Sequence, residues 1–599
     1  MIKLSDYVIQ RLAQEVRHVF FLPGGGCMHL VDSLGRCDAI ERVCNLHEQA
    51  CAVAADAYGQ YTNHLGVALV TTGPGGTNAI TGVAGAWLES TPCLIVSGQV
   101  KRADMVGARG VRQMGFQEID IVRVAAPITK YAVTITEPES IRYHLDKAIY
   151  LAQHGRPGPA WLDIPLDVQA AQIDETTLRA FDPAEVASPR DHTLLAQVSQ
   201  TIELLNHSER PIILVGNGVR SAKATDLFLE LIESLGIPVL TTWKMLDVLP
   251  EAHRLYVGRP GMVGQRGANF AQQNSDWLLT IGARLDLGQT GYTHSTFARA
   301  AKKIMVDVDP AEIGKMMMPI DVPICADAGD FLREFLRQIK RVTLTERTSW
   351  LARCQAWKAR YPIILPEYWQ EKNGVSNYAL LQVLAEEMAD GDLLVPGSSG
   401  ACSEVTAQAF QMLHQIRTFG CHGLGPMGFG VPASIGGCLA SGRQRTVCID
   451  GDGGFQMNIQ ELETIRRLNL PIKFFILNND GYASIRATQQ NYFAGRYVGS
   501  HPASGLTLPD TCRVASAYGL STAQISSHDH LRARVRETLD RAGPVICDVK
   551  ITPNQATAPR LSSMQKPDGS MVSKPLEDLV PFLERDEFLA NMIIPPLDE

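Results

Sequence analysis

Two short apolar runs separated by a helix-like segment constrain the fold more than any other feature of the sequence. The runs span 446–450 and 472–477, and each has the length of a buried strand. Between them, apolar side chains recur at near-helical spacing, at Ile459, Leu462, Ile465 and Leu468. A strand–helix–strand unit joins its strands in parallel through a right-handed crossover. The segment therefore predicts a parallel α/β sheet.

The same alternation of strand-like runs and amphipathic stretches recurs in three blocks, so we predict an α/β protein with three parallel-sheet domains. The first domain is expected over residues 1–175, the central one over 190–345 and the third over 370–552. Polar or charged stretches separate the blocks. A Pro-rich C-terminal tail follows over 553–599, and we expect it either to fold over the functional site or to form a disordered end.

Composition argues against several other classes of protein. Apolar residues make up 45% of the chain and charged residues 20%, which is typical of globular proteins. The net charge of −8, without a long basic run, argues against a nucleic-acid partner. The sequence predicts neither a signal peptide nor a membrane span. Its 13 cysteines form no CxxC pair, so we expect reduced thiols and a cytoplasmic enzyme rather than disulfides or a zinc site.

Both strands of the 446–479 unit end in residues that could hold a metal and a phosphate. Asp452 and Asn479 follow the two strands and should lie at the same sheet edge, where ligands bind in open α/β sheets. A carboxylate and an amide oxygen suit Mg²⁺, which keeps other positions for water and phosphates. Gly453 and Gly454 allow close approach of a phosphate at a helix N-terminus. Two ordinary turns would be the simpler explanation of either motif taken alone.

The spacing from GDG to NN resembles the signature of thiamine diphosphate (ThDP) enzymes. That resemblance implies that Asp452 and Asn479 ligate Mg²⁺ and that Gly481 supplies a backbone carbonyl. It also implies a catalytic Glu in the first domain, acting on the aminopyrimidine of the cofactor. Glu48, in VCNLHEQACAVAADAYGQ, follows an apolar run and opens a helix of small residues. The alternative for Glu48 is an exposed residue at a helix start, where the helix dipole favours it.

Further stretches resemble the acetohydroxyacid (acetolactate) synthase branch of that family. They are LPGGGCMHLVDSL, VTTGPGGTNAITGVAGAW, GRPGPAWLDIPLDVQ and GLGPMGFGVPASIGG. The first and third domains are then the pyrimidine-binding and diphosphate-binding domains. Met427 matches the bulky residue that supports ThDP in its V shape, with core packing as the alternative. The other implied ThDP contacts are Pro23, Gly24, Gly25, Gly73, Pro74, Asn78, Gly397, Ser398, Ser399 and Gly425.

The central block resembles the FAD-binding domain of the same branch. The matching stretches are GMVGQRGANFAQQNSDWLLTIGARLD and KIMVDVDPAEIGK. The implied FAD contacts are Thr242, Met262, Gly282, Arg284, Asp286, Asp307 and Asp327. The family pattern RFDDR is RLDLG here and lacks the last Arg, so a central domain without flavin stays open. The stretch VGNGVRSAK lacks a full GxGxxG pattern, which disfavours a nicotinamide dehydrogenase.

The resemblance implies decarboxylation of a 2-oxo acid, with pyruvate as first choice, and transfer of the two-carbon unit to a carbonyl acceptor. It implies ThDP, Mg²⁺ and FAD as cofactors, with no redox role required of FAD. It also implies a homodimer or homotetramer with active sites between subunits. A flavin-dependent pyruvate oxidase, a simple decarboxylase and a non-enzymatic cofactor-binding paralogue are the alternatives.

Departures from the synthases concern the acceptor. The loop between Gln99 and Phe116 is several residues longer, and ASIRATQQNYF after the metal motif lacks the synthase Trp. The tail resembles ThDP carboligases of branched-chain deoxysugar pathways. The leading prediction is therefore a ketone or nucleotide-linked keto-deoxysugar acceptor, with acetolactate synthesis from two 2-oxo acids as the alternative. The candidate substrate residues, for which solvated surface is the alternative, are Gln99, Arg112, Phe116, Gln117, Arg486 and Gln489.

Overall fold

The computed structural model describes residues 1–186, 193–343, 347–398, 400–565, 568 and 571–597. The chain divides into two compact units. The first combines Met1–Ser188, Gly391–Ser403 and Arg417–Ile551; the second combines Pro189–Asp390, Glu404–Ile416 and Thr552–Glu599. The first and third sequence blocks thus share one unit, and the tail belongs with the central block.

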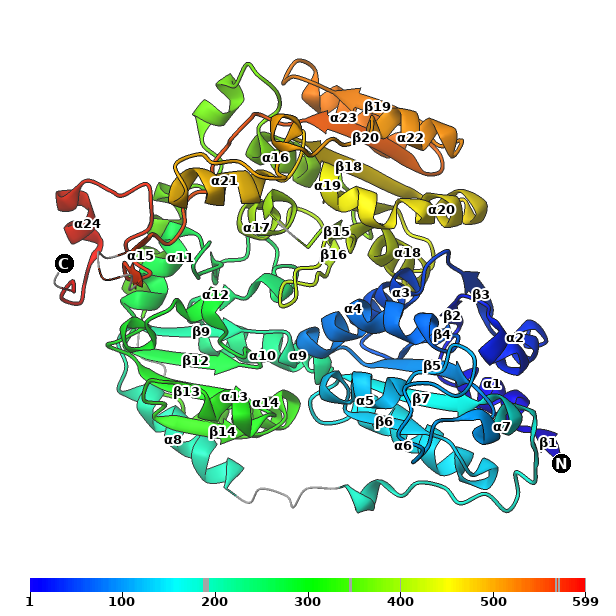
Figure 1. Ribbon diagram of the computed structural model, residues 1–599. Coiled ribbons are helices and arrows are strands. Elements are labelled where there is room, and N and C mark those ends of the chain that lie inside the picture. Colours follow the sequence, from blue (N-terminus) through cyan, green and yellow to red (C-terminus); the bar gives the residue numbers. More distant parts are fainter. Residues whose placement is uncertain (187–192, 344–346, 399, 566–567, 569–570, 598–599) are drawn as a thin grey trace. The chain divides into compact units, whose positions relative to one another are not determined.

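The first sheet of the first unit is parallel throughout and has the strand order β3-β2-β4-β5-β7-β6 (Figure 1). Its strands are β2 (His18–Phe21), β3 (Glu41–Cys44), β4 (Gly66–Val70), β5 (Cys93–Gln99), β6 (Tyr131–Thr134) and β7 (Pro159–Pro165). Its helices are α1 (Leu4–Leu12), α2 (Met28–Gly35), α3 (Glu48–Thr62), α4 (Pro74–Glu89), α5 (Ile121–Ala125), α6 (Ile141–Gln153) and α7 (Leu166–Ala170). The short strands β1 (Ile2–Lys3) and β8 (Gln172–Ile173) pair antiparallel beside it.

The second sheet of this unit is also parallel, with the order β16-β15-β17-β18-β20-β19. Its strands are β15 (Leu393–Pro396), β16 (Arg417–Thr418), β17 (Thr446–Gly451), β18 (Ile472–Asn478), β19 (Ser521–Ile525) and β20 (Val545–Lys550). Its helices are α18 (Gly430–Ala440), α19 (Asp452–Phe455), α20 (Leu462–Leu468), α21 (Ala483–Tyr492), α22 (Thr511–Ala517) and α23 (Leu531–Asp540). Numbered along the chain, both sheets have the order 2-1-3-4-6-5, so the two blocks share one topology.

The predicted strand–helix–strand unit over 446–479 is confirmed in its two strands, but the segment between them differs from the prediction. β17 and β18 pair in parallel, as predicted. The crossover, however, is not one helix: α19 and a 3₁₀ segment (Gln456–Glu461) precede α20, and Asn458 has non-helical angles of φ −135° and ψ 34°. The Asn458 side chain donates to the carbonyl of Gly428 at 2.7 Å. That contact holds the kink in place.

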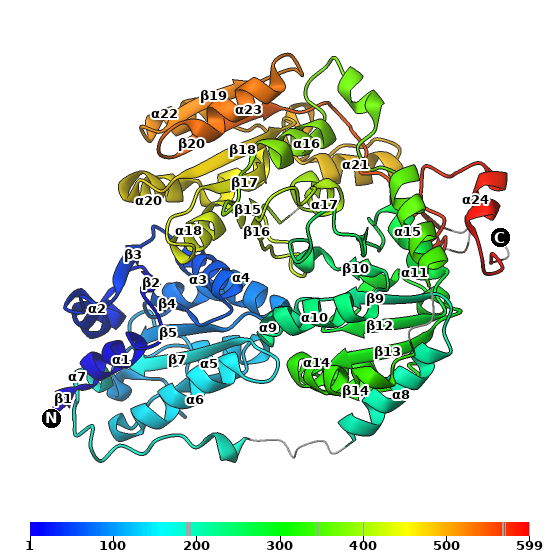
Figure 2. The same cartoon turned by 180° about the vertical axis from the view of Figure 1, so that it is seen from behind.

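Helix α3 is almost completely buried because it packs closely against α4 and α18 within the first unit (Figures 1 and 2). A Cβ on Gly436 of α18 would lie 2.1 Å from the carbonyl oxygen of Ala54. A Cβ on Gly82 of α4 would lie 2.6 Å from the Ala52 methyl. Glycine on the two neighbours and alanine on α3 therefore let the backbones approach, which fixes the helix that begins at Glu48.

The sheet of the second unit is parallel, with the order β11-β10-β9-β12-β13-β14. Its strands are β9 (Pro211–Val215), β10 (Val239–Thr241), β11 (Tyr256–Gly258), β12 (Trp277–Ile281), β13 (Lys302–Asp307) and β14 (Val322–Cys325). Helices α10 and α14 lie side by side (Figure 2). The helices of the unit are α8 (Leu194–Asn206), α9 (Gly218–Ser221), α10 (Thr225–Leu235), α11 (Arg266–Gln273), α12 (Leu287–Thr290), α13 (Pro310–Gly314), α14 (Ala328–Arg337), α15 (Thr348–Arg360) and α16 (Asn377–Glu387). Helix α17 (Gly400–Ala409) spans the division between the units.

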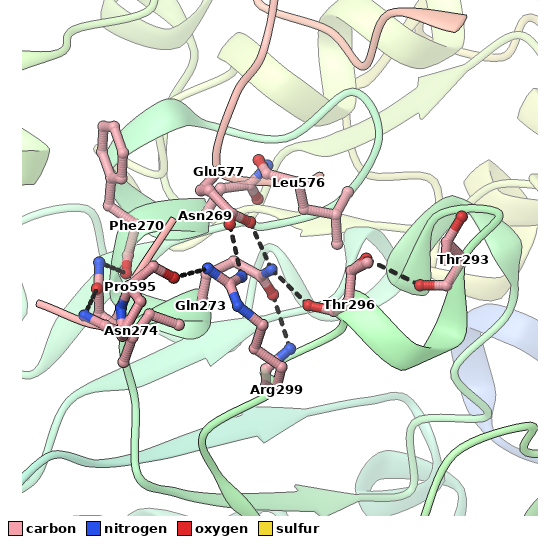
Figure 3. A network of polar contacts seen from close by, with 12 residues as sticks. Asn269, Phe270, Gln273, Asn274, Thr293, Thr296, Arg299, Leu576, Glu577 and Pro595 are labelled. Atoms are coloured by element: carbon pink, nitrogen blue, oxygen red, sulfur yellow. Dashed lines mark hydrogen bonds and ion pairs between the residues drawn. The ribbon is translucent and has the colours of Figure 1, made fainter. Parts of the chain in front are cut away.

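The described part of the tail packs against the central domain through polar side chains of α11 (Figure 3). Tail elements are β21 (Ser563–Gln565), β22 (Met571–Ser573) and α24 (Arg585–Asn591). Glu577, 1% exposed, accepts hydrogen bonds from Arg299 at 2.6 Å and from Gln273 at 2.7 Å. The Asn269 amide donates to the carbonyl of Leu576 at 2.7 Å, and Leu576, Leu579 and Phe588 join the apolar core. These described residues of the tail are therefore part of the folded unit.

Replacing Glu577 with Ala is expected to lower the free energy of unfolding by about 1–3 kcal/mol, because the partly buried Arg299 and the buried Gln273 amide each lose an acceptor. Thermal and urea denaturation of the protein without cofactors would measure this loss. Asp586→Ala, at an exposed position of α24, is the matched control and should change stability by less than about 0.5 kcal/mol. Equal losses in the two variants would contradict the structural role of Glu577.

Candidate active site

Asp452 and Asn479 meet at the carboxyl ends of β17 and β18, as the sequence predicts. Asp452 Oδ2 accepts the backbone N–H groups of Asn479 and Gly481, both at 3.1 Å, and its Oδ1 accepts that of Gly453 at 2.9 Å. Burial raises the pKa of Asp452 to about 6, although these hydrogen bonds act in the opposite direction. A cation beside this carboxylate would offset the cost of its burial.

The turn after β18 accepts only glycine at its key position. Gly481 has φ 137°, and a Cβ there would lie 2.4 Å from the carbonyl oxygen of Ser500. Asp452, Asn479 and Gly481 thus meet in one turn at the sheet edge. A carboxylate, an amide oxygen and a backbone carbonyl are hard oxygen ligands of the kind Mg²⁺ takes. The described residues contain no group of three or more His, Cys, Asp or Glu side chains that could hold a metal ion. The mixed oxygen set at Asp452, Asn479 and Gly481 is a different kind of site.

Arg486, a candidate acceptor residue, braces this turn in the structure. Its guanidinium donates to the Asn479 carbonyl at 2.8 Å, to Asn479 Oδ1 at 3.0 Å and to the Ser500 carbonyl at 3.2 Å. Gln489, one helical turn further along α21, exchanges hydrogen bonds with the backbone of Val498. The Arg486 side chain thus holds the turn that contains Asn479.

The end of β15 offers a place for a diphosphate. Ser398 Oγ is buried and has no hydrogen-bond partner among the described residues. A Cβ on Gly397 would lie 2.4 Å from Asp450 Oδ1, and one on Gly425 would lie 3.2 Å from the Ser398 carbonyl. The two glycines therefore allow close packing within the chain. The orphaned Ser398 hydroxyl is a donor that could serve an anionic oxygen. Ser399 lies outside the described residues.

Met427 lies in the loop between Gly425 and Gly428, which have φ 65° and 86°. Its side chain is partly exposed, so complete burial in the core does not explain it. The loop therefore leaves Met427 available to a ligand.

Gly453 and Gly454 lie in the first turn of α19, and a Cβ on Gly453 would lie 2.3 Å from the ring of Tyr482.

Glu48 is the first residue of α3 and is 7% exposed, which contradicts the alternative of an exposed helix-start residue. The Asn78 amide of α4 donates to Glu48 Oε2 at 3.0 Å. A Cβ on Gly75 would lie 3.7 Å from Glu48 Oε1. The structure thus brings two predicted cofactor residues, Glu48 and Asn78, into direct contact.

The remaining first-domain positions lie in the turns around β2 and β4. A Cβ on Gly24, between Pro23 and Gly25, would strike the Thr71 side chain at 2.4 Å. Gly73 has φ 62°, and a Cβ there would lie 2.1 Å from the Gln117 carbonyl. Pro74 opens α4, where its missing N–H costs nothing. Gln117 therefore contributes its backbone to this edge.

The candidate acceptor residues of the first domain fall into two groups. Gln99 is 2% exposed, and its side-chain amide already has partners within the domain. It donates to the Ile119 carbonyl and the Asp163 carboxylate, and it accepts from the backbone N–H of Val100. Burial raises the pKa of Asp163 to about 7. Phe116, by contrast, is 87% exposed, and Arg112 is also exposed. The structure shows Gln99 as an internal brace and the loop residues as free to contact solvent.

The central sheet has the strand order 3-2-1-4-5-6, which is that of dinucleotide-binding domains. The loops after β9 and β12 meet at the switch point, where a Cβ on Gly282 would lie 2.6 Å from the Cα of Gly218. The predicted flavin positions Thr242, Gly282, Arg284, Asp286, Asp307 and Asp327 all lie at or just beyond the carboxyl ends of strands. This edge fits a dinucleotide.

Two of the predicted flavin residues also have structural partners. Arg284 pairs with Asp286 at 3.1 Å, and Asp286 caps α12 by accepting the N–H of Gln289. Met262 accepts at its carbonyl from the N–H of Leu561 in the tail, at 2.6 Å. The tail therefore helps to set the loop that carries Met262.

Three family models match the chain: the N-terminal TPP binding domain of thiamine pyrophosphate enzymes at residues 2–124, the central domain at 198–335 and the C-terminal TPP binding domain at 398–549. The acetolactate synthase large subunit of Cyanidium caldarium is 33% identical over 564 residues, covering 92% of this chain and 93% of that protein. The corresponding subunit of Corynebacterium glutamicum is 32% identical over 585 residues, covering 96% and 90%. This chain belongs to the thiamine pyrophosphate enzyme family.

Within the thiamine pyrophosphate enzymes, the chain is acetolactate synthase-like. These relatives favour the alternative of the sequence analysis over its leading prediction of a keto-sugar acceptor. The three parallel-sheet domains correspond to the three matched models, which confirms the predicted fold class. In the part of the chain that the structure describes, no helix is long and apolar enough to cross a membrane.

In this thiamine pyrophosphate enzyme, one further residue bears on the site and was not predicted from the sequence. Glu461 is completely buried and bonds to the turn that precedes Glu48. A glutamate in an otherwise amphipathic segment carries no local signal of that contact. Only its position between apolar residues, NIQELETI, could have suggested burial.

Proposed function

We propose that this enzyme decarboxylates a 2-oxo acid, with pyruvate as donor, and joins the two-carbon unit to the carbonyl of a second 2-oxo acid. The main support is that Asp452, Asn479 and Gly481 meet in one turn. The chain is also about one-third identical to acetolactate synthases. Mg²⁺ would be held by this oxygen set and would bind the diphosphate of ThDP. The Ser398 hydroxyl would donate to a diphosphate oxygen.

ThDP, when bound, supplies the carbon nucleophile and the electron sink that release CO₂ from a 2-oxo acid. Glu48 holds and releases a proton at the aminopyrimidine. Because the Asn78 amide donates to Oε2, Oε1 is the oxygen left to exchange a proton with the aminopyrimidine. Burial of Glu48 limits the access of bulk water to this oxygen. Met427 would support the cofactor between its two rings.

FAD is proposed to lie along the carboxyl edge of the central sheet. The 3-2-1-4-5-6 strand order and the close glycines at the switch point support this placement. Release of bound flavin on denaturation, detected by its absorbance, would test it. We also propose a homodimer or homotetramer in the cytoplasm, with Glu48 of one subunit and the metal-binding turn of another sharing each cofactor, by resemblance to the family.

A second candidate function is transfer to a larger carbonyl acceptor, such as a nucleotide-linked keto-deoxysugar. The exposed loop that carries Arg112 and Phe116 favours this candidate, because a cation and an aromatic ring suit a phosphorylated nucleotide. Helix α21 contains no Trp. By resemblance, acetolactate synthases carry a Trp after the metal motif, and that Trp bears on the choice of acceptor.

One experiment separates these candidates. ¹³C-labelled pyruvate is incubated with enzyme, ThDP, Mg²⁺ and FAD, with and without a nucleotide-linked 4-keto-deoxysugar, and followed by ¹³C NMR. Acetolactate as the fast product in both tubes is expected. A labelled two-carbon branch on the sugar, with little acetolactate, would establish the second candidate instead. Hydrogen peroxide without ligation would mean an oxidase, and no CO₂ from any 2-oxo acid would overturn both proposals.

A further inference from the structure

A buried carboxylate in the crossover between β17 and β18 accepts hydrogen bonds from the turn that leads into α3. Glu461 is fully buried. Its Oε1 accepts the backbone N–H of Leu46 at 2.8 Å. Its Oε2 accepts the Asn45 amide at 2.9 Å and the Thr464 hydroxyl at 2.8 Å. All three donors are neutral, so the carboxylate is held by hydrogen bonds aimed at it.

The residues that Glu461 contacts immediately precede Glu48, the proposed catalytic residue. Asn45 follows β3 and donates its own N–H to the Phe21 carbonyl at 3.0 Å. His47 then caps α3 by accepting the N–H of Gln49 at 3.1 Å. Glu48 begins the helix. The backbone that enters α3 is therefore fixed at Asn45, Leu46 and His47. Glu461 accepts hydrogen bonds from Asn45 and Leu46, and the backbone N–H of His47 also favours its anion.

Neighbouring contacts reinforce the same junction without replacing Glu461. Arg467 of α20 donates to the Cys44 carbonyl at 2.7 Å, and Arg443 pairs with Glu41 of β3 at 2.7 Å. Both arginines are at least partly exposed, and both contact residues that precede Asn45 in the chain. Burial raises the pKa of Glu461, whereas the hydrogen bonds it accepts favour its anion. Only this side chain reaches Leu46 N–H in the described network.

We propose that Glu461 is a positioning residue for Glu48, acting through the entry turn of α3 rather than on the cofactor. The inference rests on the proposed role of Glu48 and adds a determinant to it. A carboxylate presents acceptors to both Asn45 and Leu46, whereas an amide must turn its NH₂ group toward one of these two donors. Proton transfer depends steeply on placement, and a shift of about 1 Å costs roughly 100-fold in rate.

The test is Glu461→Gln in the holoenzyme. We expect kcat to fall about 10- to 100-fold while the Kd for ThDP and the KM for pyruvate change less than about 2-fold. Amide hydrogen exchange at Leu46, measured on the protein without cofactors, should become faster by at least about 10-fold, because a single amide oxygen cannot accept from both Asn45 and Leu46 and the turn loses one of its two anchors. Glu463→Gln, which removes a partly exposed ion pair with Arg466 on the same segment, is the control. It should change neither kcat nor the exchange at Leu46.

A second variant makes the test independent of general destabilisation. Asn45→Asp combined with Glu461→Gln exchanges donor and acceptor across the contact, so the new amide at 461 can donate to the new carboxylate at 45 while still accepting from Leu46. We expect this pair to recover most of the lost kcat and to slow the Leu46 exchange again. Unchanged kcat with faster exchange, lost kcat with unchanged exchange, or no recovery in the pair would each overturn the proposal. If instead Glu48→Gln retained turnover, the role of Glu48 would fail, while the exchange at Leu46 would still report on the Glu461 contact.

Discussion

Turnover of the Glu48→Gln variant is expected to fall by roughly 10²- to 10⁴-fold, the range for loss of a general acid–base, while ThDP stays bound. The amide has the same shape and can still accept the hydrogen bond from Asn78, so the pocket keeps its form. It cannot hold and release a proton at the aminopyrimidine. The measurements are the rate of CO₂ release from pyruvate and the Kd of ThDP by titration calorimetry.

The matched control for Glu48→Gln is Glu139→Gln, an exposed glutamate in the same compact unit. It should retain full turnover, which would show that loss of one negative charge is not the cause. Activity of Glu48→Gln equal to that of the unmodified enzyme would overturn the assignment of Glu48. Parallel loss of turnover and ThDP affinity would point instead to a cofactor-binding role.

Asp452→Ala is expected to weaken Mg²⁺ binding by more than the roughly 10- to 100-fold typical of losing an outer-shell partner. The carboxylate is the only charged member of the oxygen set, and it also orders the turn by accepting the N–H groups of Asn479 and Gly481. ThDP affinity should fall with it, because the metal neutralises the diphosphate. Titration of Mg²⁺ at saturating ThDP, followed by protein fluorescence, would measure the change.

Asp480→Asn separates the effect of a ligand from that of local charge. Asp480 lies in the same turn, is exposed, and has φ 58°, a conformation that asparagine tolerates. The control should keep metal affinity within about 3-fold, as expected of an exposed charge screened by solvent. If both variants lost Mg²⁺ equally, the site would depend on charge near the turn, and Asp452 would not be a specific ligand.

Strands were more predictable than the helix between them. Periodicity located β17 and β18 because a buried strand needs an unbroken apolar run. The crossover was expected as one helix, yet it breaks at Asn458, whose amide bonds to the carbonyl of Gly428. That partner lies 30 positions earlier in the chain, and local spacing contains no information about it.

The candidate site shows the same division between what is local and what is not. The placement of Asp452 and Asn479 followed from strand direction alone. The sequence could not show which oxygens Arg486 would contact, and the structure commits it to the turn at Asn479 and Ser500. Similarly, the shared topology of the two sheets in the first unit was hidden, because strand order depends on long-range pairing rather than on residue type.

The contact between α11 and the tail affects how the chain can fold during its synthesis. Asn269 is made 307 positions before Leu576, whose carbonyl accepts its hydrogen bond. At a synthesis rate of about 5–20 residues per second, roughly 15–60 s pass between the two. Throughout that interval, Asn269, Gln273 and Arg299 lack their partners in the tail. The central domain therefore reaches its final packing only after most of the remaining chain has left the ribosome.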